Sequence, residues 1–196
     1  MEVTVAFPTE IWVGTLEGID NRSIEDEILY REKVEKSEIK SNKGGWQSLD
    51  NFHHDESFSS IWGLVYKEFD LLCLHNNYKD LKIEVINAWA NVNRFKDFNI
   101  SHYHDRSNWS CVYYVTVPDD SGKIVFIDPR ISRSMVTENN LVRNYDNLSQ
   151  SSEYYVHPLE GRFIIFPSWL VHYVEPNQSD SPRVSISFNV SLNEYT

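Results

Sequence analysis

Two histidines, His102 and His104, stand two residues apart, just before the aromatic and β-branched segment Trp109–Val115. In an extended strand, side chains i and i+2 leave the same face about 7 Å apart. Two imidazoles at that spacing can bind one metal ion if a third ligand comes from another part of the chain. His172 is the candidate for that third ligand.

Asp105 leaves an alternative open, because non-haem Fe(II) sites commonly combine two histidines with one carboxylate. His104 and Asp105 are adjacent, so their side chains diverge in a strand and form a poor chelate. His102 could pair with Asp105 only if the chain turns between them. We favour the two histidines and keep Asp105 as a residue that orients a ligand or faces the substrate.

Arg183 begins a segment in which polar and apolar residues alternate. Arg183, Ser185, Ser187 and Asn189 share one face of an extended strand, and the residues between them are Val184, Ile186 and Phe188. A polar inner face in an aromatic-rich chain indicates a polar pocket. The alternative is an edge strand whose serine face meets solvent, and periodicity alone does not separate the two.

The charge balance limits the class of partner. The chain has 18 Lys and Arg residues against 29 Asp and Glu residues, a net charge of −11, so we expect neither nucleic acid nor a membrane surface as partner. A small anionic co-substrate would need a buried cation, and Arg183 is a candidate.

Cys73 and Cys111 lie in apolar segments and are expected to be free thiols. The chain start does not resemble a signal peptide, and no apolar window reaches the roughly 18–20 residues of a membrane span, so a cytoplasmic protein is expected.

The spacing of apolar residues along the chain changes near residue 80. Before it, apolar residues recur at helical spacing in Ser23–Lys40, with Ser23 as the expected N-cap, and from about Ser57 to Leu74, while Lys43–Ser48 is predicted to be a loop. After it, strand patterns dominate. The predicted strands are Leu81–Val92 (with a slip before Ala88), Trp109–Val117, Lys123–Ile127, Glu153–His157, Gly161–Phe166, Leu170–Val174 and Arg183–Leu192, and Asp128–Ser152 is the longest loop. We predict an α+β fold with a β-sandwich or barrel core, in one domain of a helical support (1–79) and a β core (80–196).

Three blocks of the chain, Ser101–Val115, Pro118–Arg130 and Pro158–Asn189, together carry a family resemblance. Their order of His-x-His, a distal His and an Arg eleven residues further on resembles the 2-oxoglutarate- and Fe(II)-dependent oxygenases, in particular the prolyl-hydroxylase-like oxygenases of bacteria and phages. The resemblance spans roughly residues 80–192.

The resemblance implies a cupin-like jelly roll, the double-stranded β-helix, and hydroxylation of a substrate with O₂ and 2-oxoglutarate. It implies that His102, His104 and His172 hold Fe(II), and that Arg183 pairs with the distal carboxylate of 2-oxoglutarate. Ser185 and Tyr114 are the further expected contacts of the co-substrate, with Tyr114 preferred to Tyr113 on strand parity. The candidates for substrate contact are Asp128 and Arg130 at the mouth of the long loop, although these two residues could equally form a turn with an ion pair.

The sequence leaves open whether the substrate is a small molecule or a peptide. It also leaves open the oligomeric state, including a homodimer. Two alternatives to a dioxygenase stay open. One is a metal-binding jelly roll that does not use 2-oxoglutarate, and the other is a non-catalytic accessory protein of a phage or bacterium.

Overall fold

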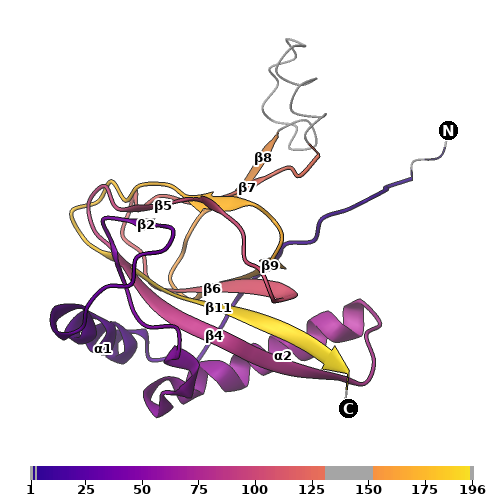
Figure 1. Cartoon of the computed structure of the whole chain (residues 1–196), viewed down its shortest axis with the longest axis horizontal. Helices are drawn as coiled ribbons and strands as arrows, with labels where there is room; N and C mark the ends of the chain where they lie inside the picture. Colours follow the sequence, from indigo (N-terminus) through magenta and orange to yellow (C-terminus); the bar gives the residue numbers. More distant parts are fainter. Residues whose placement is uncertain (1, 3, 131–151, 195–196) are drawn as a thin grey trace, which may run out of the picture.

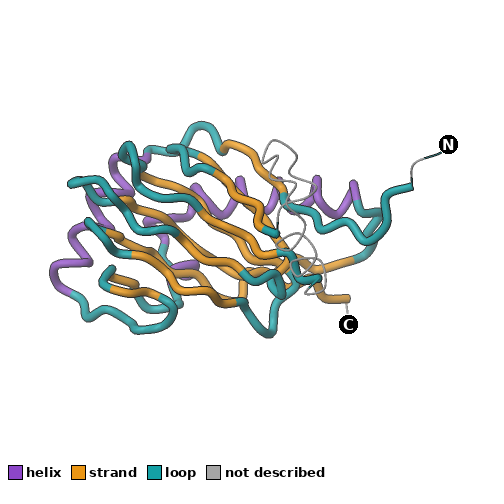
Figure 2. Tube along the Cα trace, turned by 90° about the horizontal axis from the view of Figure 1, so that it is seen from above, coloured by secondary structure: helices purple, strands orange, loops and turns teal. Residues whose placement is uncertain are grey.

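A computed structural model describes residue 2, residues 4–130 and residues 152–194 of the chain. Two antiparallel sheets face each other, and two helices cover the outer face of one of them (Figures 1 and 2). The predicted combination of N-terminal helices with a β core is therefore confirmed. No helix in this part of the chain is long and apolar enough to cross a membrane.

The larger sheet contains six strands in the order β1-β9-β6-β11-β4-β3. The strand bounds are β1 Trp12–Thr15, β3 Trp46–Gln47, β4 Leu81–Asn93, β6 Trp109–Thr116, β9 Arg162–Pro167 and β11 Arg183–Glu194. Strand β11 lies in the middle of this sheet, because it pairs with β4 on one side and β6 on the other. The alternative that it is a solvent-facing edge strand is therefore wrong.

The smaller sheet contains five strands in the order β2-β5-β10-β7-β8. The strand bounds are β2 Asn42–Lys43, β5 Phe98–His102, β7 Ile124–Ile127, β8 Glu153–Val156 and β10 His172–Val174. Strand β10 is central, with β5 and β7 as its neighbours. The long predicted loop Asp128–Ser152 lies mostly outside the described residues.

Helix α1 (Asn21–Val34) starts earlier than its apolar pattern suggested. The carboxylate of Asp20 accepts a hydrogen bond from the Ser23 backbone N–H at 3.2 Å, so Asp20 is the N-cap and the assignment of Ser23 was wrong. An aspartate at this position satisfies one of the free N–H groups of the first turn, that of Ser23, which leaves Ser23 inside the helix. The helix ends at Val34, because Glu35 is extended.

Helix α2 (Ser59–His75) follows two short 3₁₀ turns, η1 (Phe52–His54) and η2 (Glu56–Phe58). Both helices pack against β4, β6 and β11 through one apolar core, whose fully buried members include Ile28, Phe58, Ile61, Val65 and Phe69. Alternate residues of the strands supply the other side of this core, so their remaining residues face the smaller sheet.

The expected loop Lys43–Ser48 is wrong in part, because it holds the last residue of β2 and the whole of β3. Strand β2 pairs with β5 in one sheet, and β3 pairs with β4 in the other. The chain turns between them at Gly44, where φ is +89°, and a Cβ at this position would lie 1.8 Å from the Asp97 carboxylate. Glycine thus allows the chain to cross from one sheet to the other within two residues.

Candidate functional site

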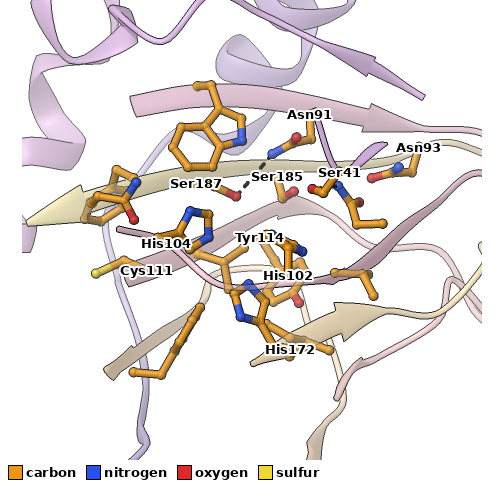
Figure 3. A pocket seen from close by; sticks show the side chains of 18 of the residues that line it. Ser41, Asn91, Asn93, His102, His104, Cys111, Tyr114, His172, Ser185 and Ser187 are labelled. Carbon is orange, nitrogen blue, oxygen red and sulfur yellow. Dashed lines mark hydrogen bonds between the residues drawn. The ribbon is translucent and has the colours of Figure 1, made fainter. Parts of the chain in front are cut away.

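The candidate site is a cavity between the inner faces of the two sheets (Figure 3). Three strands of the larger sheet supply its polar wall, because their side chains alternate between the cavity and the helix-covered core. The members of this wall are Trp89, Asn91 and Asn93 on β4, Tyr114 on β6, and Arg183, Ser185, Ser187 and Asn189 on β11. The predicted polar face of the last strand therefore lines a pocket.

His102, His104 and His172 lie together on the side of the cavity formed by the smaller sheet (Figure 3). One ring nitrogen from each falls within 4.8 Å of the others. The ring centroids of His102 and His172 are 4.4 Å apart, since these residues are directly paired across β5 and β10. His104, just beyond the end of β5, has its ring 5.0 Å from His102 and 5.3 Å from His172.

Backbone carbonyls fix the orientation of two of these rings. The Nδ1 of His102 lies 2.7 Å from the Ile100 carbonyl, and the Nδ1 of His172 lies 2.9 Å from the Leu170 carbonyl. A carbonyl only accepts, so Nδ1 must carry the proton in both rings. Nε2 of each ring then has a free lone pair, which is the state a metal ligand requires.

All three histidines are held in the neutral form. Burial, and after it the neighbouring His102, lowers the pKa of His104 from 6.5 to about 4. Burial, followed by the same neighbour, lowers the pKa of His172 to about 3, and burial also lowers the pKa of His102. Three neutral, converging nitrogen donors fit a transition metal such as iron, zinc or nickel.

Arg183 lies in the same cavity and is 1% exposed. Its Nη1 donates to the backbone carbonyls of Ser121 and Gly122, the latter at 3.2 Å. Its Nη2 is buried and has no hydrogen-bond partner among the described residues. Burial lowers the pKa of this guanidinium, and no aspartate or glutamate of the described chain lines the cavity.

The two neighbouring tyrosines of β6 face opposite ways. Tyr114 lines the cavity, and burial raises its pKa to about 12, although the nearby Arg183 acts in the other direction. Tyr113 belongs to the core under the helices, where its hydroxyl donates to the Asn21 side chain at 2.6 Å. Ser185 sits directly opposite Tyr114 across β11 and β6. The structure thus places Tyr114 and Ser185, and not Tyr113, beside Arg183.

The other predicted residues lie outside the cavity. The Asp105 carboxylate is 80% exposed and lies 3.7 Å from Arg106, so it does not join the histidines. Asp128 and Arg130 form an ion pair at 2.7 Å in a separate groove beside the N-terminal segment. This pairing corresponds to the alternative of a turn with an ion pair.

Sequence reasoning missed the contribution of β4. Trp89, Asn91 and Asn93 face the cavity, and the Trp89 ring lies 5.7 Å from that of His104. The Asn91 side chain donates to the Ser187 hydroxyl at 3.1 Å. The alternation of these residues with Ala90 and Val92 was the available signal, and it has the same form as the pattern on β11.

Comparison with known proteins connects this geometry to a family. Residues 87–189, just over half of the chain, match the model of the family described as "Putative 2OG-Fe(II) oxygenase". This match includes the three histidines and Arg183. A search of curated protein sequences finds no match.

Solved structures of low identity share the fold. A prolyl-4-hydroxylase from Pseudomonas putida aligns with a TM-score of 0.63 at 16% identity, over 96% of this chain and 94% of that one. A prolyl hydroxylase from Trichoplax adhaerens, in complex with a hypoxia inducible factor peptide, gives 0.61 at 12% identity, over 92% and 83%. HygX from Streptomyces hygroscopicus, with nickel and 2-oxoglutarate bound, gives 0.59 at 10% identity, over 93% and 82%.

These neighbours confirm the fold, and the family match covers the segment that builds the cavity. The chain therefore belongs to the 2OG-Fe(II) oxygenase family and is an Fe(II)- and 2-oxoglutarate-dependent dioxygenase.

Proposed function

We propose that His102, His104 and His172 hold the Fe(II) ion, and that Arg183 binds the distal carboxylate of 2-oxoglutarate. The observation that carries this proposal is a buried guanidinium with an unpartnered Nη2, in the same cavity as three converging imidazoles. The enzyme then hydroxylates a C–H bond of a peptide or a small molecule.

A buried charge without a counter-ion is costly, and proteins normally pair it. The hydrogen-bond partners of Arg183 in the described chain are two backbone carbonyls, which satisfy one end of the guanidinium, while Asp97 and Glu175 act on its charge without contacting it. The other end presents N–H groups that match a carboxylate in shape and charge. An anionic co-substrate would complete the site, and the absence of acidic residues from the part of the cavity wall that the structure describes suits such a ligand.

The strand register separates the arginine end of the cavity wall from the histidine end. Arg183 pairs with Asn93, and Ser187, four residues along β11, pairs with Trp89, whose ring lies beside His104. Four residues of strand span about 13 Å. A ligand that reaches from Arg183 to the histidines must therefore be elongated, and a five-carbon dicarboxylate with its keto acid end at the histidines has that form.

Each residue then has a defined task. Bound Fe(II) would supply the activation of O₂, coupled to oxidative decarboxylation of 2-oxoglutarate to succinate and to hydroxylation of the substrate. The three neutral histidines would offer nitrogen lone pairs to the metal and would leave coordination positions open for the keto acid and O₂. Arg183 orients the co-substrate, and the hydroxyls of Ser185 and Tyr114 can donate to it.

We also assign the two facing sheets to the double-stranded β-helix, with residues 1–79 as helical support and 80–196 as the core of one domain. The prolyl hydroxylases among the similar structures favour a peptide substrate. The net charge of −11 favours a basic or neutral substrate, and the free thiols of Cys73 and Cys111 favour a reducing, cytoplasmic setting.

The test is an anaerobic titration of the Fe(II)-loaded protein with 2-oxoglutarate, followed through the visible charge-transfer band of the chelate. We expect the band in the wild type and in Arg22→Ala, an exposed arginine of helix α1. Arg183→Ala should lose it while still binding iron. A band of unchanged strength in Arg183→Ala would overturn the role of Arg183, and failure of the wild type to bind iron would overturn the ligand set.

A further inference from the structure

His104 is the one histidine of the cluster that no strand of the described chain holds. His102 and His172 lie opposite each other in paired strands, and each ring donates to a backbone carbonyl. His104 lies beyond the end of β5, in the connection of residues 103–108, and no hydrogen bond of its ring occurs among the described residues. Its position must therefore come from the way this connection is attached to its surroundings.

Ser168, which is 0% exposed, takes part in three of the hydrogen bonds that attach this connection, and Asn108 adds two more to β11. The carbonyl of Ser168 accepts from the His104 backbone N–H at 2.9 Å, and its own N–H donates to the Asn108 carbonyl at 3.1 Å. Ser168 thus binds the connection at both ends. It lies at the end of β9, four residues before His172, so it links the segments that carry two of the three histidines.

The Ser168 side chain adds a third attachment through a chain of hydroxyls. Ser107, in the His104 connection, donates to the Ser168 hydroxyl at 2.7 Å, and Ser168 and Ser110 are 2.9 Å apart. Ser110 donates its single proton to the Asn189 carbonyl oxygen at 2.7 Å, so Ser168 must be the donor to Ser110. Every hydroxyl donates once, and the proton order is Ser107 to Ser168 to Ser110 to Asn189.

This serine chain ends in the wall of the cavity. The Asn189 amide donates to the Asn87 carbonyl oxygen at 2.8 Å, which fixes it between β11 and β4. The connection that carries His104 is therefore fastened, through Ser107 and Ser168, to the central strands of the larger sheet. A fully satisfied buried network of this kind is rigid, and removal of one member leaves unpaired polar atoms in the interior.

We propose that Ser168 is a positioning residue of the metal centre, which holds His104 in reach of His102 and His172. This inference rests on the proposed function, because it assumes that the three histidines bind the metal. It goes further in naming the residue and the hydroxyl chain that set the geometry of the least constrained ligand.

The test is a titration of the metal-free protein with Co(II), which reports histidine coordination by visible absorption and needs no turnover. We expect Ser168→Ala and Ser107→Ala each to raise the dissociation constant by about tenfold, the lower end of the effect of removing groups that orient metal ligands. Ser107→Thr retains the hydroxyl at a half-buried position and should restore wild-type affinity. Ser101→Ala, an exposed serine beside His102, should leave affinity unchanged.

The thermal unfolding midpoint of the same metal-free samples separates positioning from general stability. A lower midpoint with unchanged affinity in Ser107→Ala would overturn the proposal, and this variant decides the question even if Ser168→Ala does not fold. Equal weakening by Ser107→Ala and Ser107→Thr would also overturn it, because the hydroxyl would then not matter. If the wild type itself binds no Co(II), the ligand set fails, and the inference fails with it.

Discussion

The histidine cluster predicts a steep loss of stability of the metal-free protein in mild acid. The pKa of His104 is lowered from 6.5 to about 4, and that of His172 to about 3, by burial and by neighbouring histidines. The unfolded chain takes up protons on these residues as the pH falls through 6.5, and the folded protein does not. Stability is therefore fully present above pH 6.5 and decreases as the pH falls toward the folded pKa values.

The size of the effect follows from the two pKa differences. Between pH 7 and pH 5, each of the two histidines should cost about 2 kcal/mol, or about 4 kcal/mol together. That is a large fraction of the roughly 5–15 kcal/mol by which a domain is stable. The pKa of His102 is lowered as well and acts in the same direction.

The assay is urea unfolding of chelator-treated protein at both pH values, for the wild type and for a His104→Gln/His172→Gln variant. Carboxylates titrate in both proteins, so the difference between them isolates the histidines. We expect the wild type to lose about 4 kcal/mol more than the variant. His157→Gln, an exposed histidine outside the cavity, should behave as the wild type. A difference below about 1 kcal/mol would show that these rings are not held neutral by burial.

Three further substitutions distinguish residues that shape the cavity from residues outside it. Gly122→Ala should lower the unfolding midpoint and weaken 2-oxoglutarate binding, because Gly122 has a φ of +79° and the new Cβ would lie 2.4 Å from the Glu175 backbone oxygen. The control Gly14→Ala, which has open space around it, should change neither. Tyr114→Phe should weaken 2-oxoglutarate binding in the anaerobic titration, whereas Tyr113→Phe should cost about 1 kcal/mol of unfolding free energy and leave that binding unchanged. Asp105→Ala should leave Co(II) affinity within about twofold of the wild type, since exposed ion pairs contribute little; loss of metal binding would restore Asp105 as a ligand.

Local sequence pattern predicted which residues of the last strand line the cavity. The alternation along Arg183–Asn189 has a period of two, which any strand converts into one polar and one apolar face. The same rule selected Tyr114 over Tyr113. It also anticipated the slip before Ala88, where the register between β4 and β11 shifts by one residue at a bulge.

Other features depended on contacts that sequence spacing does not encode. Periodicity could not tell a central strand from an edge strand, because the two differ only in which partners lie alongside. The N-cap at Asp20 and the strands around Gly44 were missed for a related reason, since each is decided by one hydrogen bond or one close approach.

The sequence by itself determined which residue types are available for the chemistry: two histidines at chelating spacing, a distal histidine, and an arginine on a polar strand face. Only the tertiary structure decided that these residues meet. His172 reaches His102 through the pairing of β10 with β5, and Ser168 fixes His104 from the end of β9. These contacts join residues about 60–70 positions apart, and they form because the two sheets bury their inner faces against each other.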